Sequence, residues 1–375
     1  MSGFYVHIPF CEQHCHYCAF AVSVGPRSQY APYVERLVRE IGLAAWPGPP
    51  GTLYLGGGTP SLLDSGMMRR VLEAVGPCAG EVTIEANPGT LARDRLETWR
   101  ELGINRVSLG AQSFDENDLA RAGRLHTNRD TIGDCELLGR MGFDNVNLDL
   151  IAGLPGQDRR RWLENLEWIE RLSPEHVSIY LLELEDSTLW AKKPPAMHAD
   201  EDHAWFYAAA ADRLGEMGYT HYEVSSWARP GRECQHNRGY WTGIPYRGVG
   251  LGAHSFRGAE RFWNTRSMAE YARRLDAGQL PVEGSETRTA RVELEEAFLL
   301  GLRQMEGFDV SVIARSLGFE YPREWLGRVA ALESAGLIDF EDPFLKLAPA
   351  GWLLASGVTE ELLCPSLLSI SEAIR

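Results

Sequence analysis

The stretch YVHIPFCEQHCHYC runs from Tyr5 to Cys18 and joins a short apolar segment to three closely spaced cysteines. The segment YVHI at its start is rich in aromatic and β-branched residues, which predicts a β-strand. We therefore expect the cysteines to lie in a loop at the C-terminal end of that strand. Functional side chains gather at this end of the strands in parallel α/β sheets.

The cysteine spacing C-x3-C-x2-C predicts a metal centre, formed by Cys11, Cys15 and Cys18. A cubane [4Fe-4S] cluster normally takes four cysteine ligands, so three would leave one iron open. The alternative is a zinc site, because three thiolates and one imidazole suit tetrahedral zinc. Its fourth ligand would be one of the histidines His7, His14 or His16.

Further strand and helix patterns alternate along the first two thirds of the chain. The expected strands are YVHI, TLYLGGG, EVTIEA, RVSLGAQ, NVNLDLIAGLP and HVSIYLLEL. The helical stretches between them are expected over 30–43, 66–75, 91–102, up to 141, 160–172 and 202–217. Six strand–helix units predict a parallel sheet.

Unusual polar residues and glycines fall at the predicted C-terminal strand ends. They are Gly56 to Thr59, Glu85, Asn87, Gln112 and Asp149. The topology should bring them to one face of the sheet. Loops of any α/β fold carry such residues, so a single position alone indicates no site.

The pattern changes near Thr220, where glycine- and aromatic-rich segments predict extra strands and loops over 220–288. Helical stretches follow over 293–305, 310–317 and 324–334, and GLIDFEDPFLKLAPAG then predicts a β-hairpin before a last helix. We expect three regions: a core over 1–219, an extension over 220–288 that carries HNRGYW, and a small winged-helix-like α+β domain over 289–375.

Composition restricts the possible partners of this 375-residue chain. The formal net charge of −15 and the absence of a basic face argue against nucleic acid, including for the winged-helix-like region. The N-terminus lacks the pattern of a secretion signal, and no apolar run is long enough to span a bilayer. We expect a cytoplasmic protein whose membrane contact, if any, is peripheral; the sequence leaves open whether it forms a homodimer.

Motifs beyond the cysteines resemble a known family. The spacing CxxxCxxC soon after a first strand is the signature of the radical S-adenosylmethionine (SAM) superfamily. Six further segments are similar to the oxygen-independent coproporphyrinogen III oxidase subfamily: YVHIPFC, GGGTPS, IEANP, LGAQSF, GRLH and LDLIAGLPGQ. The resemblance implies a partial (β/α)6 TIM-type barrel, and so many matches in order favour the iron–sulfur cluster over zinc.

The resemblance also implies which residues hold SAM beside the cluster. Tyr5 would lie beside the cluster, Tyr17 against the adenine, and Gly57, Gly58 and Thr59 at the amino-acid end. The ribose and methionine parts would be held by Glu85, Gln112, Arg124 and Asp149. Glycine backbone N–H groups suit a carboxylate, and the carboxylates accept from ribose hydroxyls or the ammonium group.

Two features separate this chain from the oxidase pattern. The oxidases resemble CxxxCxxCxC, whereas Phe20 stands here at the position of the additional cysteine. CQHNRGYW at 234–241 resembles the HNxxYW motif of a haem-chaperone branch of the subfamily, which implies His236 as a haem ligand. Imidazole is a common axial ligand of haem iron, and Tyr240 and Trp241 suit a porphyrin face. His254 is a second candidate, for which a structural role is favoured.

Two functions therefore follow from the sequence. The first is a haem chaperone that carries haem as cargo to haem-requiring proteins on a scaffold with a [4Fe-4S] cluster and SAM. The alternative is a radical SAM enzyme that decarboxylates a tetrapyrrole. Whether the chain is an enzyme, and whether SAM is cleaved, stays open.

Overall fold

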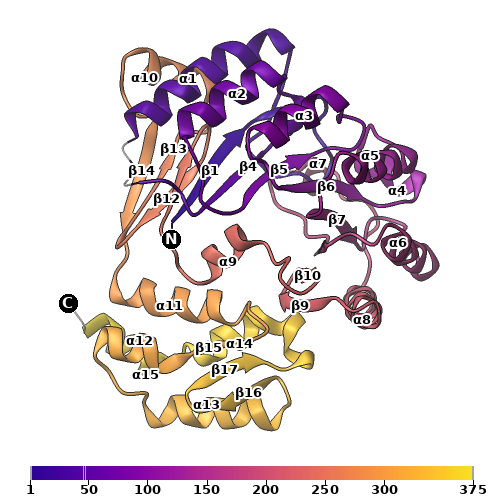
Figure 1. The fold of residues 1–375 in the computed structure, drawn as a ribbon. Helices are drawn as coiled ribbons and strands as arrows, with labels where there is room; N and C mark the ends of the chain where they lie inside the picture. Colours follow the sequence, from indigo (N-terminus) through magenta and orange to yellow (C-terminus); the bar gives the residue numbers. More distant parts are fainter. Residues whose placement is uncertain (1, 45, 47, 374–375) are drawn as a thin grey trace.

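The computed structural model describes residues 2–44, 46 and 48–373. Its main sheet has 12 strands in the order β14-β13-β12-β11-β1-β4-β5-β6-β7-β8-β10-β9 (Figure 1). The strands of the predicted units are β1 (Gly3–Ile8), β4 (Thr52–Gly57), β5 (Val82–Ala86), β6 (Arg106–Gln112), β7 (Val146–Ala152) and β8 (His176–Leu181). All six are parallel, so the predicted barrel core is confirmed.

The helices of these units begin and end within a few residues of the predicted positions, with two differences: the stretch predicted up to 141 is divided into two helices, and a short helix over 189–192 was not predicted. They are α1 (Tyr30–Leu43), α2 (Ser65–Val75), α3 (Arg93–Glu101), α4 (Glu116–Ala122), α5 (Asn128–Arg140), α6 (Arg159–Leu172), α7 (Leu189–Lys192) and α8 (Asp200–Glu216). Local sequence sets several of their starts. The side chain of Asp64 caps α2, and Thr127 forms a capping box with Asp130 at α5.

The segment over 220–288 extends the same sheet at both edges. Its elements are β9 (Thr220–Glu223), β10 (Ser226–Ala228), α9 (Gln235–Trp241), β11 (Tyr246–Val249), β12 (His254–Arg257), β13 (Glu260–Asn264), α10 (Met268–Asp276) and β14 (Val282–Thr287). Strand β11 pairs with β1 in parallel, and β12 to β14 continue in antiparallel pairs. Trp227, Val249 and Tyr271 share the core of the barrel, so the extension and the barrel pack as one unit.

The prediction of strands and loops alone is wrong for this segment, because it also contains the helices α9 and α10, and α9 covers CQHNRGYW. The carboxylate of Glu81 accepts hydrogen bonds from the backbone N–H groups of Gln235 and His236, at 3.2 Å each. Glu81 thereby satisfies the free N–H groups at the start of the helix. Because the capping residue is distant in the sequence, the residues around 235 carry no local pattern that predicts the start of this helix.

The C-terminal region forms a second hydrophobic core. Its elements are α11 (Ala290–Gly301), β15 (Phe308–Asp309), α12 (Val310–Leu317), α13 (Arg323–Ser334), β16 (Ile338–Glu341), β17 (Phe344–Leu347), α14 (Ala355–Leu362) and α15 (Pro365–Ala373). The predicted hairpin is present as β16 and β17, and β15 adds a third strand. The single last helix is replaced by α14 and α15. Figure 1 shows this region below the sheet, with α11 between them.

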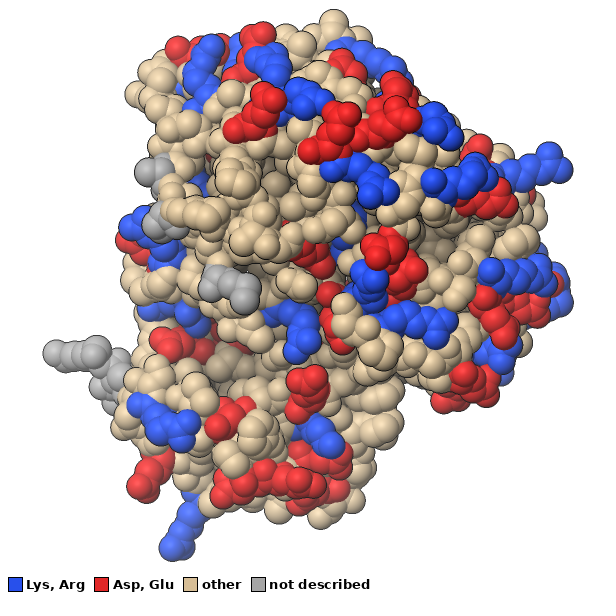
Figure 2. Space-filling view, in the orientation of Figure 1, with Lys and Arg blue, Asp and Glu red and all other residues tan. Residues whose placement is uncertain are grey.

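Short elements complete the chain. They are β2 (Phe10–Cys11), β3 (Ser23–Val24) and the 3-10 helices η1 (Arg27–Gln29), η2 (Pro60–Leu62) and η3 (Pro349–Leu354). Among the described residues, no single helix is long and apolar enough to cross a membrane, although one bent pair, 349–362 with 365–371, passes by length and composition. On the face in Figure 2, positive and negative side chains are interspersed.

Candidate functional site

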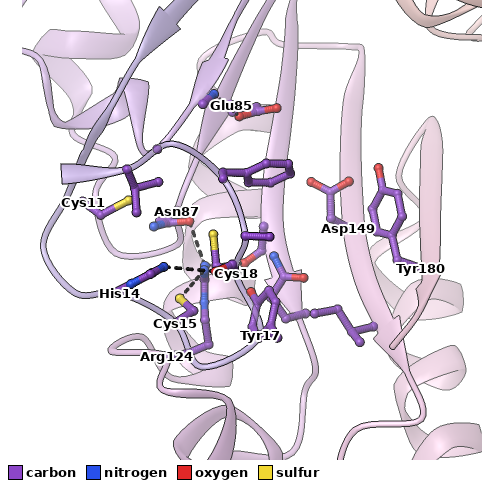
Figure 3. A pocket seen from close by; sticks show the side chains of 18 of the residues that line it. Cys11, His14, Cys15, Tyr17, Cys18, Glu85, Asn87, Arg124, Asp149 and Tyr180 are labelled. Carbon is purple, nitrogen blue, oxygen red and sulfur yellow. Dashed lines mark hydrogen bonds between the residues drawn. The ribbon is translucent and has the colours of Figure 1, made fainter. Parts of the chain in front are cut away.

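The three cysteines line one cavity of about 480 Å³, which we call the cysteine cavity. It lies at the C-terminal ends of β4 to β8, as the topology predicts for polar groups in such a sheet. Cys11 ends β2, and the loop after it is turned back by a hydrogen bond from the backbone N–H of Cys18 to the carbonyl of Cys15, at 3.2 Å. Figure 3 shows the side chains of Cys11, Cys15 and Cys18 at this cavity.

Each thiol has a different environment. Cys11 Sγ lies 3.5 Å from the hydroxyl of Thr59, and Arg124 Nη1 donates to Cys15 Sγ at 3.5 Å. Burial raises the pKa of Cys11 to about 11 and also raises the pKa of Cys18. The free thiols of Cys11 and Cys18 are therefore protonated near neutral pH, and metal binding must displace their protons.

The donor arrangement fits a cluster better than a single zinc ion. Within the described part of the chain, no group of three or more His, Cys, Asp or Glu is close enough to hold one metal ion. His14 Nε2 is hydrogen-bonded to the carbonyl of Cys18, and His16 Nδ1 to that of Arg121. A cubane is wider than one ion, so three thiols around one cavity suit a [4Fe-4S] cluster with an open iron.

The glycine stretch at the end of β4, Gly56 to Gly58, packs against the cysteine loop. Gly57 has φ +116°, and a Cβ there would lie 2.6 Å from Cε1 of His7. A Cβ at Gly58 would lie 2.7 Å from the carbonyl oxygen of Phe10, one residue before Cys11. Gly57 therefore leaves room for the imidazole of His7 and Gly58 for the backbone of the cysteine loop, in addition to any ligand contact. Thr59 is buried and faces Cys11 and Asn87 rather than the cysteine cavity.

Two carboxyl side chains enter the cavity, Glu85 from β5 and Asp149 from β7, with β6 between the two strands (Figure 3). Glu85 accepts from the hydroxyl of Tyr54 at 2.9 Å and from the backbone N–H of Gly57 at 3.0 Å. Burial raises the pKa of Glu85 to about 7, and the charge of Asp149 adds to this rise. Asp149 accepts from Asn147 and Ser108, and burial also raises its pKa. The cavity therefore holds two carboxyl groups whose protonated form is favoured by burial.

Arg124 and Gln112 also line the cysteine cavity. Arg124 Nη2 donates to Asn87 Oδ1 and to the carbonyl of Gly110, at 2.8 Å each, which aims the guanidinium at Cys15. Gln112 adopts φ +65°, an uncommon conformation for a residue other than glycine. Such conformations are concentrated at functional sites.

Of the predicted SAM contacts, seven line the cysteine cavity: Tyr17, Gly57, Gly58, Glu85, Gln112, Arg124 and Asp149. Tyr54, Ser108 and Tyr180 line it too and were not predicted as site residues. They lie on β4, β6 and β8. A single side chain that points inward from a strand belongs to no recognisable sequence motif. Alternation along each strand is the signal that points to them.

Tyr5 and His236 lie outside the cysteine cavity. The Tyr5 ring stacks on Tyr54, with centroids 6.2 Å apart, and its hydroxyl is 3.0 Å from His7 Nδ1. His236 is 3% exposed; its Nδ1 is 2.9 Å from the Thr52 hydroxyl and its Nε2 is 2.9 Å from the Tyr240 hydroxyl. Direct binding of haem iron by His236 requires one of these hydrogen bonds to break.

A second cavity, also of about 480 Å³, lies beside the first. We call it the aromatic cavity because of its lining of aromatic and imidazole rings. These rings belong to Tyr5, His7, Phe20, Tyr240, Tyr246, His254 and Trp263. Phe20 is 71% exposed and lines both cavities. The structure thus brings the predicted His254, the HNRGYW helix and the cysteine loop around adjacent spaces.

Comparison with known proteins identifies the family. The radical SAM superfamily model matches residues 5–169, and the HemN C-terminal domain model matches residues 289–354. "Heme chaperone HemW" from Synechocystis sp. is 38% identical, over 81% of this chain and 78% of that protein. HemW from Bacillus subtilis is 31% identical, over 96% of this chain and 98% of that protein. The chain belongs to the HemW family.

The fold of this HemW-family chain is shared with a solved structure, coproporphyrinogen III oxidase (HemN) from Escherichia coli. The TM-score is 0.85, and the match covers 96% of this chain and 89% of that chain, at 22% sequence identity. The α/β class with a radical SAM core, predicted from the cysteine loop outward, is confirmed.

Proposed function

We propose that this HemW-family protein is a haem chaperone that binds haem and hands it to haem-requiring proteins. The observation that carries the proposal is the similarity to relatives named as haem chaperones along nearly the whole chain. Phe20, in place of the additional cysteine of the oxidase pattern, and the HNRGYW helix beside an aromatic cavity support the same function.

We further propose that the cysteine cavity holds a [4Fe-4S] cluster and SAM. Cys11, Cys15 and Cys18 would bind three irons, and SAM would bind the open iron. The SAM-binding residues would be Tyr17, Gly57, Gly58, Glu85, Gln112, Arg124 and Asp149, with Thr59 behind Cys11 and Tyr5 at the neighbouring wall. When bound, the cluster supplies an electron that can cleave SAM.

The residues of this chain suit that ligand. The guanidinium of Arg124 and backbone N–H groups of the glycine stretch suit a carboxylate, and Glu85 and Asp149 suit an ammonium or hydroxyl donor. The proposal includes cytoplasmic haem-requiring proteins as recipients. The free state of all seven cysteines is consistent with a reducing compartment.

The test is haem binding and transfer. The protein, purified anaerobically with its cluster, is titrated with haemin and then mixed with apomyoglobin. We expect one haem per chain and passage of that haem to apomyoglobin. Absence of stoichiometric binding would overturn the proposal.

The alternative enzyme function has its own assay. The protein is incubated anaerobically with SAM, a reductant and coproporphyrinogen III. We expect no protoporphyrinogen IX, and its formation by a cluster-loaded sample would establish oxidase activity instead.

A further inference from the structure

The aromatic cavity is assembled by strands far apart in the chain. Tyr5 comes from β1, Tyr246 from β11, His254 from β12 and Trp263 from β13, which are successive neighbours in the sheet. Its volume of about 480 Å³ falls within the roughly 300–1,000 Å³ typical of small-molecule sites. A cavity with this lining suits a flat, largely apolar ligand.

His254 presents an available imidazole to this cavity. The residue is exposed, and neither ring nitrogen has a hydrogen-bond partner among the described residues. Its ring stacks on the Trp263 indole, with centroids 5.7 Å apart and an interplanar angle of 24°. Although the residue is exposed, its ring is partly desolvated by its neighbours. This desolvation and the charges of Arg261 and Arg266 outweigh the charge of Glu286 and lower the pKa of His254, which favours the neutral imidazole that binds metal.

A buried hydrogen-bond network around Glu40 fixes the backbone that precedes His254. The buried carboxylate of Glu40 accepts from Gly250 N–H at 2.9 Å, from Asn264 Nδ2 at 2.6 Å and from the Tyr271 hydroxyl at 2.6 Å. Asn264 also donates through its own N–H to the carbonyl of Ala253, at 2.9 Å. This buried network holds the turn that places His254 at the mouth of the cavity.

His236 has the opposite surroundings. The cavity that it borders is only about 50 Å³, well below the roughly 300–1,000 Å³ of typical ligand sites. Its Nε2 is hydrogen-bonded to Tyr240, whose ring packs against Tyr246 at 4.7 Å and lines the aromatic cavity. The HNRGYW helix therefore reaches the larger cavity through Tyr240, with His236 behind it as a positioning residue.

We propose that haem docks in the aromatic cavity with His254 as an axial ligand of its iron and with Tyr240 and Trp263 against the porphyrin. Arg266, which also donates to the carbonyl of Ala19 at 3.5 Å, lines the cavity and would pair with a propionate. The inference rests on the proposed haem-chaperone function and deepens it by naming the site. It also places haem beside the cysteine cavity, and Phe20 is the one described residue that lines both cavities.

The test is a haemin titration of the full-length, cluster-loaded protein, followed by absorbance in the Soret region. We expect His254→Ala to lower haem affinity by about tenfold or more and to shift the Soret band of the remaining complex. Added imidazole should restore the wild-type band, because it replaces the missing ligand. His236→Ala should weaken binding without moving the band.

Controls separate a failed site from a failed function. His203→Ala, on α8, should bind haem as the wild type does, and SAM binding by His254→Ala should be unchanged, which shows that the variant is folded. If wild-type protein binds haem and His254→Ala keeps its affinity and Soret band, the His254 site is wrong and the chaperone proposal stands. If the wild type binds no haem, both are wrong. A Soret shift in His236→Ala, with none in His254→Ala, would reassign the ligand to His236.

Discussion

The cysteine cavity and the aromatic cavity have the same volume, about 480 Å³ each, and share Phe20, yet their walls differ in chemistry. The first collects thiols, carboxylates, a guanidinium and backbone amides from parallel strand ends. The second collects aromatic rings and the exposed imidazole of His254, mainly from β1 and the sheet extension, with His7, Arg266 and Glu283 also in its lining. Adjacent spaces with such different walls indicate two different ligands, one charged and polar and one flat and apolar.

The largest expected effect falls on the cysteine cavity alone. Cys11→Ala should remove the cluster, because two thiolates cannot replace the three-ligand set. Iron and sulfide analysis after anaerobic purification should give close to no iron, against the content of one [4Fe-4S] cluster in the wild type. Cys135→Ala, on α5, should keep the full content. Retained cluster in Cys11→Ala would contradict the ligand assignment.

Lowering the pH should weaken the binding of SAM in the cysteine cavity. Because burial raises the pKa of Glu85 to about 7, this carboxyl is protonated below that pH and cannot accept as a carboxylate. We expect SAM affinity to be about tenfold lower at pH 6 than at pH 8, measured by isothermal titration calorimetry on cluster-loaded protein. Glu85→Gln should bind weakly at both pH values. A wild-type affinity independent of pH would contradict the role of Glu85.

A smaller effect is expected from a substitution that alters the aromatic cavity alone. A Cβ at Gly284, on β14, would overlap the Trp263 indole, so Gly284→Ala should push that ring toward the cavity. We expect haem affinity to fall several-fold while SAM affinity stays at the wild-type value. Ser285→Ala, one position along the same strand, is the matched control and should change neither. Equal losses of both ligands would show that the cavities are not independent.

The smallest effect should reach both cavities. Phe20 is mostly exposed, so Phe20→Ala should change the free energy of unfolding by no more than about 0.5 kcal/mol. It should lower both haem and SAM affinity a few-fold, because the ring lines both spaces. Chemical denaturation and the two titrations measure this. A loss confined to one ligand would assign Phe20 to that cavity only.

Prediction from the sequence worked best where a site is built from short contiguous motifs. The cysteine loop, the glycine stretch and the polar strand ends each carry their own signal, and parallel topology brings strand ends together without further information. Tyr54 and Tyr180 were not predicted as site residues, because in the sequence an inward strand position that faces a cavity looks the same as one that faces the core. Helix α9 was not predicted, because the residue that caps its N-terminus, Glu81, is distant in the sequence.

The sequence by itself therefore determined the parallel core, the cysteine loop and the family resemblance, since strand periodicity and motif spacing are local properties. Only the tertiary structure decided how HNRGYW is used. It buried His236 between Thr52 and Tyr240, and it carried His254 to the cavity shared with Tyr5. The reason is physical: β1 and β11 become neighbours through sheet hydrogen bonds between residues more than two hundred positions apart, which no local pattern encodes.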